Sequence, residues 1–251
     1  MNKMSKRYLK SGRDLASEFI VIVLGVLAAF AVEGWSEDRE NRVLEVNYLS
    51  RLQDDLQRDL EQIGQARWSS FAKARATTTL LDAIDDPLAL EIPEFTESIK
   101  SIDFSVPATE VISVDHMGEL VWLARRDRTL MPARGTYDEM ISTGRFLVIE
   151  DDQLRADVIN YYSDLDGSAE LADWIAEASS KLDEVLEPTG LNAFDYSYVE
   201  DPLPKLRDLK GLALALRTIR WSSLRHVYIL EQVEKNAKEL TEKINENLAI
   251  D

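Results

Sequence analysis

An uncharged apolar run near the amino end constrains this chain most. The fourteen residues from Phe19 to Val32 carry no charge, and a basic stretch comes before them: Lys3, Lys6, Arg7, Lys10 and Arg13. At about 1.5 Å per residue the run spans about 21 Å as a helix, whereas a bilayer core is about 30 Å thick. Extending it from Leu15 to Trp35 gives 21 residues, with Glu18 and Glu33 near the ends, where carboxylates reach the headgroups. The run therefore predicts a short transmembrane helix.

The charges around this run predict its orientation. Residues 1–17 hold five Lys and Arg against one acid, and positively charged flanks stay in the cytoplasm. We therefore expect a basic cytoplasmic tail (1–17), a transmembrane helix (18–35) and an exterior, periplasmic domain (36–251), in a bacterial inner membrane. A 17-residue tail is too short for a cytoplasmic output domain, which disfavours a transducing receptor.

A cleavable signal peptide is the alternative interpretation of the amino end. Ala29-Phe30-Ala31 is an A-x-A triplet after an apolar stretch, the outline of a cleavage site. Cleavage there would leave a soluble secreted protein. Against it, the acids Asp14 and Glu18 are unusual in such peptides, and the helical pattern continues through the triplet. We favour a retained anchor, and whether the segment is ever cleaved stays open.

The rest of the chain is acidic and lacks cysteine. From Gly34 onward there are 24 Lys and Arg against 43 Asp and Glu, a formal charge of −19. Such a surface repels nucleic acid and anionic lipid, so we expect no nucleic-acid partner. Zero cysteines exclude disulfides and thiol chemistry.

Apolar residues at steps of three and four predict two long helices. The first spans about Leu15 to Asp85 and the last about Leu206 to Leu248, and their stripes form a helix seam of coiled-coil type. Its members are Leu49, Leu52, Leu56, Leu60, Ile63, Leu230, Val233, Leu240 and Ile244. His226 also falls on this seam, where a polar residue fixes the register of the helices or meets a carboxylate more often than it acts in catalysis. The charged residues between the stripe positions are predicted to lie on solvated faces: Asp54, Asp55, Arg58, Asp59, Glu61 and Glu242.

The middle of the chain is predicted to hold shorter helices. We expect them around 94–102, 109–126 and 136–143, the last ended by a left-handed Gly144. Asp151 or Asp152 caps a further helix that ends before Pro188, with a kink at Asp166-Gly167. Alternating strand-type runs are scarce. The predicted fold class is therefore all-α: one amino-terminal transmembrane helix continues into a long juxtamembrane helix, which packs with other long helices in a bundle.

Three segments carry a resemblance to a known family. The first runs from Glu18 through Trp35 into Tyr48-Leu-Ser-Arg-Leu-Gln-Asp-Asp-Leu, the second is Thr136-Tyr-Asp-Glu-Met-Ile-Ser-Thr-Gly, and the third holds Leu154-Arg155 and Tyr161-Tyr162. Together they resemble an uncharacterised bacterial family of small single-pass inner-membrane proteins, a family whose function is unassigned. The resemblance implies a retained anchor and an exterior helical domain, and it carries no catalytic residue.

Signatures of chemistry are scarce in this sequence. The chain has two histidines, and Asp115, His116 and Glu119 are weak candidates for metal ligands that lack a matching second set. Patterns for hydrolases, nucleotides and dinucleotides are missing. We expect no catalytic residues, no metal and no cofactor.

The leading hypothesis is a membrane-anchored, non-enzymatic helical scaffold or accessory subunit. It would associate with itself as a homo-oligomer or with an inner-membrane protein complex, besides the lipid bilayer. Gly25 and Ala29 form a small-xxx-small pair that lets another membrane helix approach closely. The alternative hypothesis is a secreted or anchored helical enzyme or ligand-binding domain with a carboxylate-based site.

Overall fold

The computed structural model describes residues 12–86, 117–126, 130–190 and 203–249, and every regular element among these residues is helical. The all-α prediction is confirmed. The long helices are α1 (Gly12–Ala83), α5 (Asp152–Leu186) and α7 (Leu212–Ala249). Five short elements accompany them within the described ranges: α3 (Met117–Arg125), α4 (Gly135–Ser142), η2 (Arg145–Val148), η3 (Glu187–Thr189) and α6 (Leu203–Arg207).

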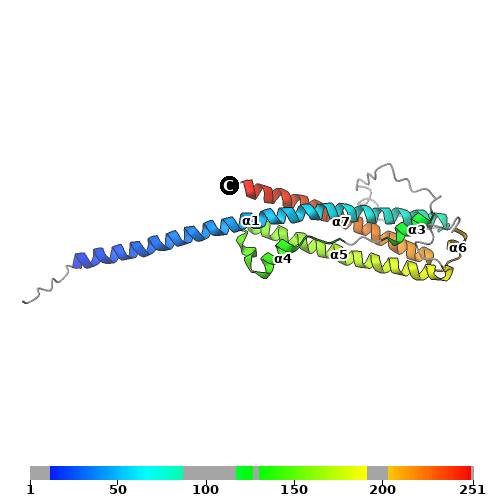
Figure 1. The fold of residues 1–251 in the computed structure, drawn as a ribbon, viewed down its shortest axis with the longest axis horizontal. Coiled ribbons are helices and arrows are strands. Elements are labelled where there is room, and N and C mark those ends of the chain that lie inside the picture. Colours follow the sequence, from blue (N-terminus) through cyan, green and yellow to red (C-terminus); the bar gives the residue numbers. More distant parts are fainter. Residues whose placement is uncertain (1–11, 87–116, 127–129, 191–202, 250–251) are drawn as a thin grey trace, which may run out of the picture.

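Helix α1 is one uninterrupted helix of 72 residues, about 108 Å long at 1.5 Å per residue. Its first part projects beyond the other helices without a neighbour (Figure 1). The side chains from Glu18 to Glu33 are all exposed. Of the described residues, α1 alone contains a segment long and apolar enough to cross a bilayer, and no part of that segment is buried by the protein. An apolar helix left uncovered in this way fits the predicted membrane anchor.

The remainder of α1 packs with α5 and α7 in a three-helix bundle (Figure 1). Helix α7 runs antiparallel to α1, because Gln53 bonds Asn245 while Ser70 meets His226. The apolar core consists of two clusters. The proximal cluster lies near the anchor and includes Leu49, Leu52, Leu56, Ile63, Val158, Leu165, Leu230, Val233, Leu240 and Ile244. The distal cluster lies at the other end and includes Leu80, Leu81, Leu120, Leu182, Leu186, Leu206, Leu216 and Ile219.

The predicted seam residues meet in the proximal cluster. Eight of the nine are buried, and Leu60 packs against the cluster while partly buried. Each fully buried aliphatic side chain contributes about 1.5–3 kcal/mol relative to an exposed one. This cluster therefore ties the juxtamembrane part of α1 to the carboxyl-terminal part of α7.

The last helix differs from its prediction. The sequence pattern predicts one helix from about Leu206 to Leu248, but the chain breaks between α6 and α7 at Gly211, whose φ is +91°. This left-handed conformation suits glycine, which lacks a Cβ. Apolar residues keep steps of three and four across the break, at Leu206, Leu209, Leu212 and Leu216, so periodicity alone does not reveal it.

The other predicted boundaries fall close to the observed ones. Gly144 has a φ of +69° after α4, and Asp151 caps α5 by accepting from the N–H groups of Gln153 and Leu154. Helix α5 continues without a break through Asp166-Gly167, where the sequence predicts a kink. The predicted helix 94–102 lies outside the described residues, as does the start of the one at 109–126, which is described from Met117.

Candidate functional site: a buried carboxylate cluster

Four acids lie along the stretch of α1 that packs against α4, η2 and the start of α5, and we call them the carboxylate cluster: Glu45, Asp55 and Asp59 on α1, and Glu139 on α4. Glu45 and Asp59 are 14 residues apart, about 21 Å along the helix. The three acids of α1 are between 0 and 3 % exposed. The prediction that Asp55 and Asp59 lie on solvated faces is therefore wrong. Asp59 follows Leu52 by seven residues, a spacing that returns to the same side of a helix.

Asp55 and Asp59 hold the segment that leads into α4. The Oδ1 atom of Asp59 accepts a hydrogen bond from the backbone N–H of Ala133 at 2.7 Å, and Oδ2 of Asp55 accepts from the N–H of Thr136 at 3.2 Å. Thr136 is the second residue of α4, and the N-cap residue Arg134 makes no side-chain cap. The first N–H groups of a helix lack intrahelical partners. Asp55 therefore supplies from α1 a cap that α4 lacks in its own sequence.

Glu45 holds the entry into α5 in the same way. Its Oε1 atom accepts from the backbone N–H of Glu150 at 2.9 Å, directly before the N-cap Asp151. Its Oε2 atom pairs with Arg42 at 2.6 Å, and Arg42 also donates to the backbone carbonyl of Asn247 at 3.1 Å. This pair joins α1 to the start of α5 and to the last turn of α7.

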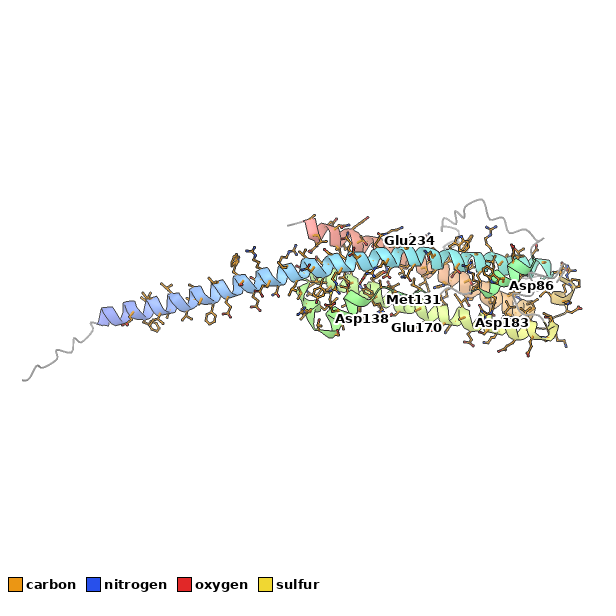
Figure 2. The ribbon with its side chains drawn as sticks, viewed as in Figure 1. Asp86, Met131, Asp138, Glu170, Asp183 and Glu234 are labelled. Carbon is orange, nitrogen blue, oxygen red and sulfur yellow. The ribbon has the colours of Figure 1, made fainter. Side chains whose placement is uncertain are left out.

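An aromatic stack covers the cluster. Tyr137 of α4 stacks on Tyr162 of α5 with ring centroids 4.2 Å apart, and Phe146 of η2 meets Tyr137 edge-on at 5.9 Å. The guanidinium of Arg134 lies over both tyrosine rings, at 5.6 and 5.5 Å. Offset aromatic pairs add about 0.5–1.5 kcal/mol each beyond their burial. Figure 2 shows Asp138 of α4 at this end of the bundle, close to the start of the exposed part of α1.

Glu139 completes the contact between α4 and α1. Its Oε1 accepts from the Tyr48 hydroxyl at 2.9 Å and its Oε2 pairs with Arg51 at 2.6 Å. The hydrogen bond from Arg51, with that from Tyr48, lowers the pKa of Glu139. This pair is partly exposed, so its contribution to stability is small.

Burial governs the ionisation of the buried members. It raises the pKa of Asp59, although the Ala133 N–H and the Tyr161 hydroxyl, 2.9 Å from Oδ2, act in the opposite direction. Burial, reinforced by Asp59, also raises the pKa of Tyr161 and Tyr162. Both tyrosines therefore stay neutral and keep their hydroxyl protons as donors.

The carboxylates of the cluster accept hydrogen bonds from donors of the same chain. Each oxygen of the four acids has a donor: Ala133 and Tyr161 for Asp59, Thr136 and Arg58 for Asp55, Glu150 and Arg42 for Glu45, and Tyr48 and Arg51 for Glu139. Buried polar groups paired in this way fix a unique local structure. The cluster thus fastens α4, η2 and the start of α5 to α1.

Of the other predicted metal and membrane-contact residues, Glu119, Gly25 and Ala29 are described, and they lie outside this cluster. Asp115 and His116 are outside the described residues, and Glu119 is exposed on α3. Within the described ranges no three potential metal-ligating side chains gather. Gly25 and Ala29 are exposed on the uncovered part of α1, where a Cβ added at Gly25 would meet nothing within 4 Å.

Parts of the three segments that carry the family resemblance meet in the carboxylate cluster, since 48–56, 136–144 and 154–162 supply four of its eight hydrogen-bond donors: Tyr48, Arg51, Thr136 and Tyr161. Fold and cluster define the class of protein: an all-α bundle whose first helix extends beyond it as a candidate membrane-spanning helix. Comparison of the chain with protein-family models, curated proteins and solved structures finds no match.

Proposed function

We propose that this protein is a membrane-anchored, non-enzymatic helical scaffold or accessory subunit of a membrane protein complex. The observation that carries the proposal is the continuity of α1, which runs from the exposed apolar segment into the proximal cluster without a break. A continuous helix holds the bundle at a fixed distance and angle from the anchor, whereas a flexible linker would not. Such a rigid connection suits a protein that holds other subunits of a membrane complex in position.

The carboxylate cluster supports a scaffold over the alternative, an enzyme or ligand-binding domain with a carboxylate-based site. A catalytic carboxylate must meet a substrate within hydrogen-bond reach. The oxygens of Glu45, Asp55 and Asp59 instead meet donors of the chain itself. These hydrogen bonds hold the segment before α4, the start of α4 and the start of α5 in place.

The proposed location is a bacterial inner membrane, with residues 1–17 in the cytoplasm and the acidic bundle in the periplasm. The basic tail before the apolar segment supports this orientation. Membership of the uncharacterised single-pass family is part of the same proposal, and it rests on the three segments that meet in the carboxylate cluster.

The face of the anchor that carries Gly25 and Ala29 is the proposed contact with a partner helix. Gly25 precedes Leu52 by 27 residues and Ala29 precedes Leu56 by the same number, which is about 7.5 turns. Both small residues therefore lie on the side of α1 opposite the bundle core. A second membrane helix at this face has room to approach without colliding with α5 or α7.

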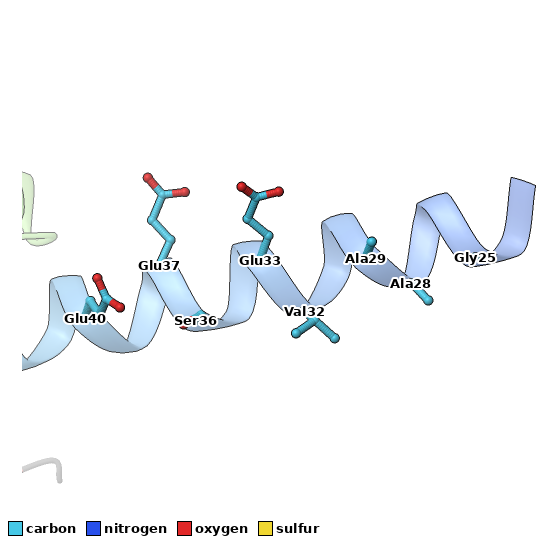
Figure 3. Close-up of a pocket in the computed structure, with 8 residues that line it drawn as sticks. All are labelled: Gly25, Ala28, Ala29, Val32, Glu33, Ser36, Glu37 and Glu40. Atoms are coloured by element: carbon cyan, nitrogen blue, oxygen red, sulfur yellow. The ribbon is translucent and has the colours of Figure 1, made fainter.

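Acidic residues continue the same face beyond the membrane segment. A shallow surface along α1 is lined by Gly25, Ala28, Ala29, Val32, Glu33, Ser36, Glu37 and Glu40, and Figure 3 shows Glu33 and Glu37 pointing the same way. Parallel pairing of two copies at this face would bring identical carboxylates together, which is unfavourable. We therefore favour a different membrane protein with basic juxtamembrane residues over a homo-oligomer.

Replacement of the small residues tests this proposal. Gly25→Leu with Ala29→Leu blocks close backbone approach while keeping the segment apolar, so association should fall while membrane insertion persists. The matched control is Val23→Leu with Ala31→Leu, because Ala31 lies about 200° around the helix from Ala29. The measurement is the mass of the complex purified in mild detergent, by light scattering. A wild-type protein that is monomeric and alone in detergent and in membrane cross-linking contradicts the scaffold.

A further inference from the structure

A layer of buried polar side chains separates the two apolar clusters of the bundle. We call it the polar layer: Ser70 and Lys73 on α1, Ser168 and Ser179 on α5, and Ser223 and His226 on α7, each less than 9 % exposed. Along α7 the distal cluster ends at Ile219 and the proximal cluster begins at Leu230. The apolar core becomes thinner at the middle of the three long helices, where the larger buried apolar side chains are Leu171, Ile175 and Val227, which belong to neither cluster.

Hydrogen bonds hold the three helices together at this level. The His226 ring joins all of them, with Nδ1 2.9 Å from the Ser70 hydroxyl and Nε2 3.3 Å from the Ser168 hydroxyl. The Lys73 ammonium donates to the Ser179 hydroxyl at 3.4 Å. The fully buried Ser223 hydroxyl has no hydrogen-bond partner among the described residues. A hydrogen bond within the folded protein replaces one that the unfolded chain makes with water, so it adds less to stability than burial of an apolar side chain does. A buried hydroxyl without a partner lowers the stability of the fold.

The two halves on either side of this layer differ in how they are held. The proximal half has the buried acids Glu45, Asp55 and Asp59 bonded to backbone N–H groups, and the stack of Tyr137 on Tyr162. The distal half is closed mainly by aliphatic side chains around a small internal void, lined by Leu80, Ile84, Val121, Leu182, Leu186, Leu206, Leu212 and Leu216. Voids of this kind forfeit contact energy.

Ion pairs at the distal end leave this contrast in place. Arg125 pairs with Asp183 and Arg207 with Asp85, and the side chains in both pairs are at least 37 % exposed. A third pair is more buried: Arg217 lies 3.0 Å from Asp86, whose side chain is 2 % exposed. Figure 2 shows Asp183 at this far end of the bundle. Exposed pairs contribute little. The distal half therefore has one buried, paired carboxylate, Asp86, where the proximal half has three and an aromatic stack, and it is the less firmly held of the two.

We propose that the polar layer divides the bundle into two cooperative units, and that the distal half opens while the proximal half stays folded on α1. Opening exposes the aliphatic residues of the distal cluster, including Leu182, Leu206 and Leu216. The anchor and the carboxylate cluster keep their structure. The device is independent of whether the proposed scaffold has a partner.

Amide hydrogen exchange of the full chain in detergent micelles tests this division. Distal amides in α5 and α7, around 178–186 and 212–219, should exchange at least about tenfold faster than proximal amides around 154–165 and 230–244. Their exchange should also depend less on urea, because a partial opening exposes less surface than global unfolding. Equal rates and equal urea dependence in both halves would overturn the proposal.

Two leucine-to-alanine substitutions, one in each apolar cluster, test which half of the bundle opens first. Leu240→Ala weakens the proximal cluster, which stays folded in the opened state, so it should speed proximal exchange and leave distal exchange unchanged. Leu216→Ala weakens the distal cluster and should speed exchange in both halves. If Leu240→Ala accelerates both halves equally, the bundle is one unit. If either variant fails to fold, the wild-type comparison alone decides.

Discussion

Asp59 combines full burial with two hydrogen bonds that no other side chain replaces. Its removal in Asp59→Ala leaves the Ala133 N–H and the Tyr161 hydroxyl without acceptors. Each unsatisfied buried group costs about 1–3 kcal/mol, so we expect a loss of about 2–5 kcal/mol. Asp59→Asn should lose less, because its amide still accepts from Ala133 and can donate to the tyrosine oxygen. Chemical unfolding of the full chain in detergent measures both, and equal losses would contradict the assigned bonds.

The same residue predicts a pH dependence. Burial raises the pKa of Asp59 in the folded state above the ordinary value of 3.8, so the folded protein binds more protons than the unfolded chain in that window. Stability contributed by this group therefore falls as the pH rises from 3.8 through the raised pKa, and is then constant. Comparing the unfolding free energy of wild type and Asp59→Asn from pH 3.5 to 7 isolates it. The difference between them should change with pH in this direction, and a pH-independent difference would contradict the burial of the charge.

The same substitution, acid to lysine, should have different effects at Asp55 and at Glu242. Asp55→Lys removes the acceptor of the Thr136 N–H and puts a positive charge at the amino end of α4, where the helix dipole is unfavourable to it. We expect a loss of about 2–4 kcal/mol. Glu242 is exposed on α7, so Glu242→Lys should stay within about 0.5 kcal/mol. Thermal melts followed by circular dichroism separate the two, and similar melting temperatures would mean that Asp55 does not cap α4.

These residues also show where sequence patterns stop being informative. The spacing of Leu49, Leu52 and Leu56 predicts a buried stripe, because a period near 3.6 can be read from one segment alone. The burial of Asp55 and Asp59 depends on which backbone N–H groups a distant segment brings to them, and periodicity contains nothing about that. The sequence signal for their burial is only that the two acids lie four residues apart beside an apolar stripe. Acids in such positions are more often exposed to solvent than buried.

At the scale of the elements, the packing of α1 on α7 carries the proximal cluster. Leu56→Asp or Leu240→Asp would place an unpaired charge among side chains that are at most 3 % exposed. A domain with about 5–15 kcal/mol of total stability should not survive either change. Leu214→Asp is the matched control, since Leu214 is on α7 and 68 % exposed. Loss of the cooperative melt in the first two variants and its retention in the third is the expected result. Wild-type melts for Leu56→Asp or Leu240→Asp would contradict the packing.

The elements were predictable to different degrees for physical reasons. Gly144 and the Asp151 cap were identified because local residue chemistry decides those positions. The break at Gly211 was missed because apolar spacing continues across it, and the conformation there depends on how α6 packs into the distal cluster. Local signals thus fix caps, and tertiary packing fixes breaks.

At the scale of the whole molecule, the proposed role requires α1 to serve both as membrane anchor and as bundle helix. With this placement the charged residues after Trp35 lie in water and the apolar residues before it lie in the membrane, with Trp35 at the boundary. Every interpretation of the acidic face beside Gly25 and Ala29 rests on this placement. The proposed scaffold role therefore depends first on the topology of the chain.

Single-cysteine labelling in intact cells tests that topology most directly. The chain contains no cysteine, so any label reports only the introduced residue. Glu242→Cys is exposed on α7, and Ser5→Cys lies in the basic tail. With a maleimide that crosses the outer but not the inner membrane, we expect labelling of Glu242→Cys in intact cells and of Ser5→Cys only after lysis. Labelling of Ser5→Cys in intact cells, with Glu242→Cys protected until lysis, would mean that the chain has the opposite topology.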